Sequence, residues 1–299
     1  QGEGPGEFRG PPTVLVGPGD TLLFVDRYVD LANRIAPDGT WLGSFEIAHD
    51  DGIDRWDSAP NGRIVSHICC RTFESPEADV VVERDLEGRV LDTLAWLPGH
   101  QGRPVVNGQL GWRFYVGEPD MALCADGSVV TGRPDQYRLN WYDAAGDLER
   151  IVILDRPNAP FTGEDQSLLK ETAERSLLEV GWSPAQIAHE QSVTILTDTY
   201  PAFVELGCRS RGSLWVSQVR PLSSFGGDET IPFGYNPPAS STHDVFDREG
   251  RFLGEVTLPQ NFLLMTYRGD NLYGRWTDDL GVHYVMVLKI AGLPPREDG

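Results

Sequence analysis

The chain has 299 residues, of which 40% are hydrophobic, and it contains 33 Gly and 22 Pro, a composition typical of a turn-rich all-β globular protein. Its formal charge of −20 at pH 7 opposes binding to nucleic acid, because an acidic surface repels phosphates. No apolar run approaches the roughly 18 residues that a membrane helix needs. Composition therefore excludes a nucleic-acid partner and a transmembrane segment in this stretch of chain.

A hairpin pattern recurs along the chain. Apolar alternation leads into a polar turn that ends in Gly, and alternation follows again, which is typical of a tight antiparallel hairpin. The copies cover residues 34–42, 82–90, 140–148 and 245–253, with turn glycines Gly39, Gly88, Gly146 and Gly250. The first intervals are roughly 50 residues and the last is about twice that, and this period is typical of propeller blades.

A second set of turns lies between the first ones. Each puts a turn before an apolar strand, in residues 18–25, 61–65, 126–130, 211–216 and 268–273. Inner turns that alternate with outer turns predict four-stranded antiparallel blades, which bury their faces by stacking on one another. The predicted fold class is an all-β β-propeller with about five visible blades.

The last predicted blade differs from the others. It has strands near 261–267, 271–276 and 282–290, and no clear fourth strand follows. Because an unpaired strand edge is a liability, we expect a partner strand from another part of the protein, N-terminal to this chain.

Three insertions interrupt the period. Residues 97–119 form a Gly-rich loop that can hold an extra hairpin around Gly108, 219–242 form a long loop rich in Pro, Gly and Ser, and 162–190 hold the helical stretch. Thr162 is a suitable cap for the first helix, and Ser183 with Pro184 starts a shorter second one. We expect all three to emerge on the same face, where functional loops tend to gather.

The first residues carry a resemblance to a known family. Residues 2–8 read GEGPGEF and are followed by Pro11 and Pro12. This resembles the G-x-GPGEF-x-x-P link of bacterial six-bladed NHL-like β-propellers, and the similarity continues through the outer turns to the closing strand at 281–288. The resemblance implies six blades when complete, one propeller domain over 1–299 that lacks its first blade, and an exported, extracytoplasmic protein, periplasmic or at the cell surface.

Arginines follow the second strand of every visible blade. They are Arg27, Arg71, Arg133, Arg220 and Arg275. If these positions ring the channel mouth, they form a cationic collar for a small anionic ligand, because guanidinium groups bind carboxylate and phosphate in a bidentate manner. Trp276, beside Arg275, is a further candidate for ligand contact. The alternative is that each Arg pairs with a neighbouring acid such as Asp26, Asp135 or Asp278.

His49 and Asp50 lie in the link between the first two blades. Such residues at a propeller mouth can hold one divalent ion, Ca or Zn, that polarises a carbonyl or activates water. The alternative is a solvated acidic turn, because the other histidines do not recur in register.

The four cysteines do not have zinc-ligand spacing. Cys124 and Cys208 precede inner turns of adjacent predicted blades, and they can form a disulfide or remain buried thiols. Cys69 and Cys70 are predicted to pack or to form a structural disulfide.

Two functions remain open from the sequence. The first is an exported binding or scaffold protein that recognises a small anionic ligand or a protein partner on the loop-covered face. The second is a metal-dependent propeller enzyme of lactonase, hydrolase or lyase type. Both functions occur on propellers, so the fold does not separate them.

Overall fold

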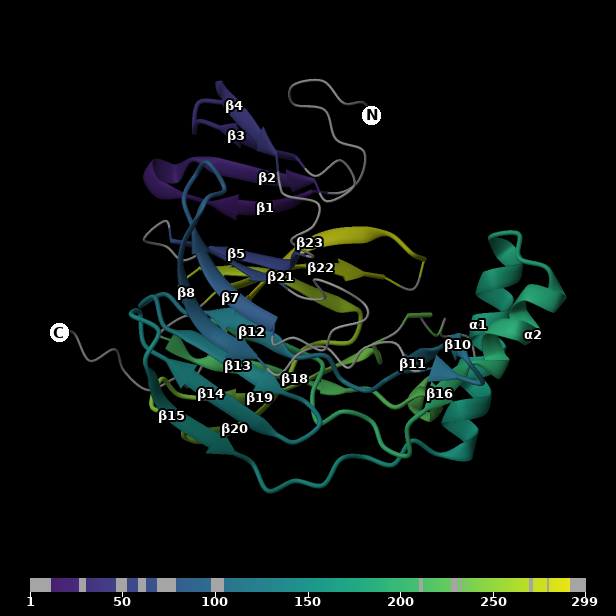
Figure 1. Ribbon diagram of the computed structural model, residues 1–299. Helices are drawn as coiled ribbons and strands as arrows, with labels where there is room; N and C mark the ends of the chain where they lie inside the picture. The colour runs from purple at the N-terminus through teal and green to yellow at the C-terminus, as the bar shows by residue number, and fades with distance from the viewer. Residues whose placement is uncertain are drawn as a thin grey trace.

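The computed structural model describes residues 12–26, 31–46, 53–58, 63–68, 79–97, 105–209, 212–226, 231, 233–234, 236–268, 271–278 and 280–290. Five antiparallel sheets follow one another along the chain, and each is built from consecutive strands (Figure 1). They are blades of a β-propeller, so the predicted fold class is confirmed.

The first four blades have four strands each. The first blade comprises β1 (Thr13–Val16), β2 (Leu22–Asp26), β3 (Leu31–Ile35) and β4 (Trp41–Glu46). The second comprises β5 (Ile53–Ser58), β6 (Ile64–Ile68), β7 (Asp79–Arg84) and β8 (Val90–Leu97). The third comprises β12 (Asp120–Leu123), β13 (Val129–Arg133), β14 (Arg138–Tyr142) and β15 (Leu148–Ile153). The fourth comprises β17 (Glu205–Cys208), β18 (Leu214–Val219), β19 (Ala239–Phe246) and β20 (Phe252–Thr257).

The fifth blade has three strands within the described residues. They are β21 (Phe262–Arg268), β22 (Asn271–Thr277) and β23 (His283–Lys289), in that order across the sheet. Residues 291–299, which follow β23, lie outside the described residues.

The outer turns repeat because one Asp and one Gly build each of them. In the third blade, the Asp143 carboxylate accepts hydrogen bonds from the backbone N–H groups of Ala145 and Asp147, both shorter than 3.0 Å. Gly146 has φ of 90°, which a residue with a Cβ rarely adopts. Asp85 and Asp247 take the same place in the second and fourth blades.

Neighbouring blades are joined by buried apolar clusters. Leu15 and Leu23 of the first blade pack with Trp56 and Ile64 of the second, and comparable clusters join the second to the third, the third to the fourth and the fourth to the fifth. No such cluster of described residues joins the fifth blade to the first. The hydrophobic core of the described blades therefore consists of four successive interfaces between neighbouring blades.

Covalent and polar links strengthen the interface between the third and fourth blades. Cys124 and Cys208 form a disulfide across it, which resolves the alternatives that the sequence left open. A loop of this length corresponds to about 4 to 5 kcal/mol of stabilisation by restriction of the unfolded chain. Nearby, the fully buried Asp244 accepts hydrogen bonds from the Tyr137 hydroxyl at 2.7 Å and from the Arg156 guanidinium at 2.8 Å.

The three insertions pack together into one unit beside the propeller. Their elements are β9 (Val105–Val106), β10 (Gln109–Leu110), β11 (Trp112–Phe114), α1 (Gly163–Glu179), α2 (Pro184–Ser192), β16 (Thr194–Leu196) and the short 3-10 helix at Leu222–Ser224. Phe114, Phe161, Leu169 and Leu222 share a buried cluster, so all three insertions meet there. Both helices begin as predicted, with capping boxes at Thr162 and Ser183. The helices project from the side of the molecule (Figure 1).

Candidate binding cavity

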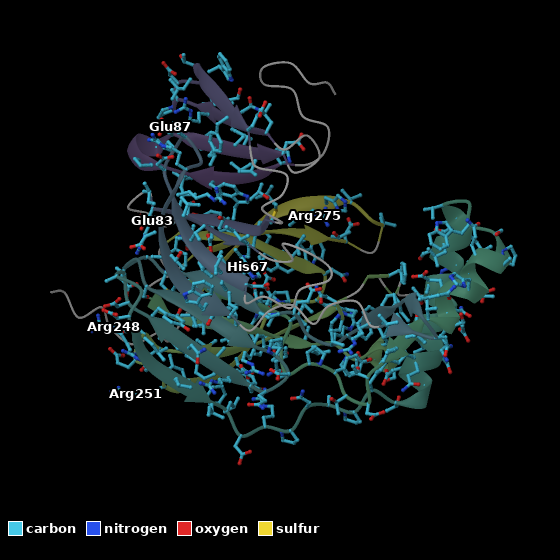
Figure 2. The ribbon with its side chains drawn as sticks, in the orientation of Figure 1. His67, Glu83, Glu87, Arg248, Arg251 and Arg275 are labelled. Atoms are coloured by element: carbon cyan, nitrogen blue, oxygen red, sulfur yellow. A yellow bond between two sulfur atoms is a disulfide. The ribbon has the colours of Figure 1, made fainter. Side chains whose placement is uncertain are left out.

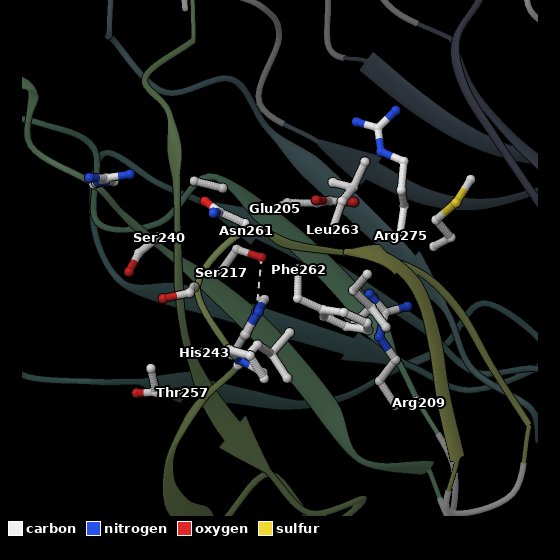
Figure 3. Close-up of a pocket in the computed structure, with 18 of the residues that line it drawn as sticks. Glu205, Arg209, Ser217, Ser240, His243, Thr257, Asn261, Phe262, Leu263 and Arg275 are labelled. Atoms are coloured by element: carbon white, nitrogen blue, oxygen red, sulfur yellow. Dashed lines mark hydrogen bonds between the residues drawn. The ribbon is translucent and has the colours of Figure 1, made fainter. Parts of the chain in front are cut away.

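A cavity of about 1140 Å³ lies where the first strands of the blades meet. Its walls come from β1, β5, β17, the middle strands of the fourth blade and the start of the fifth blade. Figure 3 shows the part of the wall from Glu205 to Arg275. The cavity therefore includes the space between the first and fifth blades, since Val14 and Val16 of the first and Leu263 and Met265 of the fifth line it. The volume is slightly above the usual range of about 300 to 1,000 Å³ for small-molecule sites and far exceeds that of a single inorganic ion.

The charged groups on the described wall are mostly positive. Four arginines and two carboxylates line the cavity: Arg55, Arg209, Arg220 and Arg275, with Asp57 and Glu205. Arg55 has a structural role, because its guanidinium contacts Asp120 at 2.7 Å and donates to the Leu206 carbonyl at 3.1 Å. Burial opposes its charge, but Asp120 and Glu205 together raise the pKa of Arg55, which stays charged.

Arg209 is placed in the wall by the backbone of β17. In an extended chain alternate residues share a face, and Glu205, Gly207 and Arg209 all line the cavity. The guanidinium lies over Gly207, where a Cβ would come within 2.7 Å of its central carbon. Gly207 therefore gives the Arg209 side chain the space that it occupies.

Ser217 and His243 form a polar pair in the same wall. They are cross-strand neighbours on β18 and β19, both largely buried, and the Ser217 hydroxyl lies 3.1 Å from His243 Nδ1 (Figure 3). Burial, with the positive charge of Arg209 next in effect, lowers the pKa of His243 to about 4. At neutral pH the imidazole is therefore neutral and offers one donor and one acceptor.

The second titratable group of note is Asp57. Burial raises the pKa of its carboxyl, although Arg55 and Arg209 act in the opposite direction. It accepts hydrogen bonds from the Ser58 N–H at 2.8 Å and from the Leu123 N–H at 3.4 Å, the latter across the blade interface. Asp57 thus holds two blades together at the cavity wall.

The arginines predicted as a collar have different surroundings. Arg220 and Arg275 line the cavity, and the Arg220 guanidinium also lies 3.7 Å over the Phe225 ring. Arg133 is not among the lining residues and pairs with Asp135 at 2.7 Å, as the alternative reading expected. Figure 2 shows Arg275 on the C-terminal sheet, well apart from Arg248 and Arg251 on the outer hairpin of the fourth blade. Arg27 and Arg71 lie outside the described residues.

Trp276 belongs to the interface between the fourth and fifth blades. Its indole N–H donates to the Gln260 carbonyl at 3.1 Å, and its ring packs near Tyr284 and against the buried cluster there. It is not among the residues that line the cavity.

The proposed metal ligands His49 and Asp50 lie outside the described residues, so the metal site and the enzyme hypothesis stay predictions. Among the residues that are described, no three His, Cys, Asp or Glu side chains gather closely enough to hold a metal ion. Within the same part of the chain, no helix has both the length and the apolar character that crossing a membrane requires.

Arg209, Ser217 and His243 were not expected from the sequence. The sequence signal for Arg209 was alternation along the first strand of a blade. Glu205, Gly207 and Arg209 stand at every second position, as Arg55 and Asp57 do on β5. The signal for His243 was weaker, because it directly follows the long loop predicted at 219–242, whereas β19 already begins at Ala239.

Known proteins share the fold with this chain at low sequence identity. A member of the DUF4221 family from Bacteroides vulgatus matches 96% of this chain and 81% of its own, with 10% identity and a TM-score of 0.54. Virginiamycin B lyase from Staphylococcus aureus, with quinupristin, matches 93% of this chain and 70% of its own, at 10% identity and a TM-score of 0.44. A putative exported protein from Bacteroides fragilis matches 92% and 69%, at 11% identity and a TM-score of 0.44.

No protein-family model matches the sequence, and no curated protein matches it either. The similarity to solved structures concerns the fold alone. The protein is therefore a β-propeller, and its activity has to be argued from its own cavity.

Proposed function

We propose that this protein is an extracytoplasmic β-propeller that binds a small organic anion in its central cavity. The main observation behind the proposal is that the whole chain is acidic whereas the described wall of the cavity is mostly positive. A chain with a formal charge of −20 gathers four arginines and only two carboxylates on the described wall of its cavity. Guanidinium groups at such a site bind carboxylate, sulfate or phosphate groups through paired hydrogen bonds.

Three of the arginines are suited to contact the ligand. The described wall carries Arg209, Arg220 and Arg275 in addition to Arg55, whose guanidinium is paired with Asp120. Around them lie neutral donors and acceptors that include Ser217, His243 and Asn261. Because His243 is neutral at pH 7, it contributes hydrogen bonds and no charge.

The disulfide supports the proposed location. Cys124 and Cys208 are bonded at an internal interface, and structural disulfides persist in oxidising compartments such as the periplasm and the cell exterior. This agrees with the expectation from the resemblance to exported propellers.

A binding experiment tests the proposal. The protein is purified without added organic anions, and citrate and inorganic phosphate are titrated by calorimetry into the wild type, Arg209→Gln and Arg133→Gln. We expect the wild type to bind citrate and Arg209→Gln to bind it at least ten times more weakly, since a charge-assisted contact contributes about 1.5 to 3 kcal/mol.

The Arg133→Gln variant is the matched control. It also removes one guanidinium from this acidic protein, but Arg133 does not line the cavity, so its affinity should stay within a factor of two of wild type. Equal weakening in both variants would show a general charge effect and contradict the cavity site. Absence of binding of both anions to the wild type would count against the proposed ligand class.

A further inference from the structure

Residues at one equivalent position of four successive blades line a second cavity. In each blade the residue stands at the fourth paired position of the first strand, counted back from the inner turn. These residues are Thr13, Arg55, Asp120 and Glu205. The cavity has a volume of about 450 Å³, and Arg55 and Glu205 lie between it and the larger cavity, since they line both. The repeat therefore brings side chains from four blades to one level of the propeller.

In the second and third blades, the side chain at this position contacts the next blade. Arg55 donates to the Asp120 carboxylate at 2.7 Å, and Asp120 accepts a hydrogen bond from the Leu206 N–H at 2.6 Å. Glu205, in the fourth blade, has no such contact among the described residues. Its carboxylate lies 3.8 Å from the Arg55 guanidinium, which is too far for a hydrogen bond, and its side chain is 54% exposed. Glu205 is therefore available to contact a ligand.

The second cavity has the opposite charge from the larger one. Its described wall holds three carboxylates, those of Glu118, Asp120 and Glu205, against the one guanidinium of Arg55. Because Asp120 pairs with Arg55, the charges of Glu118 and Glu205 remain uncompensated by a cation of this wall. The Asn236 amide donates to Glu118 at 3.3 Å and leaves its charge unchanged. A cationic group is the complementary ligand for such a wall.

The form of the wall favours an organic cation over a metal ion. Among the described residues, no three His, Cys, Asp or Glu side chains lie close enough together to hold a metal ion. The volume is within the range of small-molecule sites. Prolines from three separate segments add an apolar part to the wall, and these are Pro119, Pro201 and Pro237. Such a surface packs against the carbon atoms of a ligand.

We propose that the second cavity binds a small organic cation, with an ammonium, amidinium or guanidinium group held by Glu205 and Glu118. Asp120 is a positioning residue, because its pairing with Arg55 keeps that guanidinium from compensating Glu205. The apolar body of the ligand packs against the prolines. The site does not use Arg209, Arg220 or Arg275, so the inference does not depend on the proposed anion.

Benzamidine and benzamide test the charge requirement. Benzamidine carries an amidinium group on a phenyl ring, and benzamide has nearly the same shape without the charge. Each compound is titrated into this chain, and the backbone amide signals are followed by NMR. We expect benzamidine to shift the signals of Thr13 and Leu206 and to bind about ten times more tightly than benzamide, or better. Equal affinity for the two compounds, or no shift at these positions, would overturn the proposal.

Glu205→Gln and Glu149→Gln form a matched pair of variants. Each removes one carboxylate that lies near an arginine, and the two side chains have similar exposures of 54% and 48%. Glu149 lies on β15 and is not among the residues that line the cavity. Glu205→Gln should weaken benzamidine binding by about fivefold or more, and Glu149→Gln should leave it within a factor of about two. Equal weakening would show general attraction to an acidic protein and contradict the site.

Glu118→Gln gives a second test on another segment of the wall. It should weaken benzamidine binding by about threefold or more, and unchanged binding in both Glu118→Gln and Glu205→Gln would overturn the proposal. The result is distinguishable from that for the anion. Benzamidine binding without citrate binding would contradict the anion proposal alone, and citrate binding without benzamidine binding would contradict this one alone.

Discussion

His243 is a buried base whose neutral form the fold requires. Its pKa falls to about 4, first because of burial and second because of Arg209, whereas an unfolded His titrates near 6.5. Between these two values the unfolded chain binds more protons than the folded one, so the free energy of unfolding decreases as pH falls. The contribution of the neutral His243 to the free energy of unfolding is therefore fully present above about pH 6.5, and it is lost as pH falls towards 4.

The prediction is that His243→Gln makes stability less dependent on pH. Gln can still hydrogen-bond to Ser217 but does not titrate. Urea unfolding at pH 7.5 and at pH 5.0 should show a larger loss of stability in the wild type, by on the order of 2 kcal/mol. Carboxylates with lowered pKa values, such as Asp85 and Asp278, stay ionised in this window and are common to both proteins. Parallel pH profiles would exclude His243 as the group responsible.

Single residues were the hardest part of the structure to predict. Arg220 and Arg275 were predicted as candidates by their recurrence after second strands, and both line the cavity. Arg133 follows the same pattern but pairs with Asp135, since recurrence fixes a position on a strand and not the partner of a long side chain. Alternation along the strand placed Arg209 on the same face as Glu205 and Gly207, but it did not reveal that the side chain lies over Gly207 in the cavity wall.

Elements were more predictable than residues, because their signals are local. Turns with Asp and Gly marked every outer hairpin, and the helical insertion was marked by Thr162 and by Ser183 with Pro184. The hairpin at Val105–Leu110 lies around Gly108, where the Gly-rich loop was expected to hold one, but the parallel pairing of β11 with β16 was not predicted. The β11–β16 pairing joins residues about 80 positions apart in sequence, and no local pattern specifies such a contact.

The α1–α2 insertion should be dispensable for the propeller. The apolar cluster that it shares with the other insertions, around Leu169 and Tyr200, is separate from the four clusters between blades. Replacement of residues 163–189 by a short Gly-Ser segment should therefore retain the β-sheet circular dichroism signal and a cooperative thermal transition, at a lower melting temperature. Loss of cooperativity would show that the helices are needed for the blades to assemble.

At the scale of the molecule, the described blades form a row with two ends. A repeat unit that contacts neighbours on both sides is more stable than one that contacts a neighbour on one side only. The terminal blades of the 299-residue chain should therefore open more often than the middle ones.

Hydrogen exchange tests this difference on two equivalent residues. Leu23 of the first blade and Val130 of the third occupy matching places in their hairpins, and both side chains are fully buried. In the chain of residues 1–299, amides of the β2 peptide should exchange at least ten times faster than those of the β13 peptide. Equal rates would mean that the first blade is stabilised as well as the third.

The position of the disulfide has a consequence for proteolysis. Cys124 and Cys208 are 84 residues apart, and both helices of the exposed α1–α2 hairpin lie between them in the sequence. A protease outside the cytoplasm that cuts this hairpin would break the backbone without releasing either piece. The nicked protein would stay one covalent particle, with its third and fourth blades still joined, until a reductant separates the two fragments.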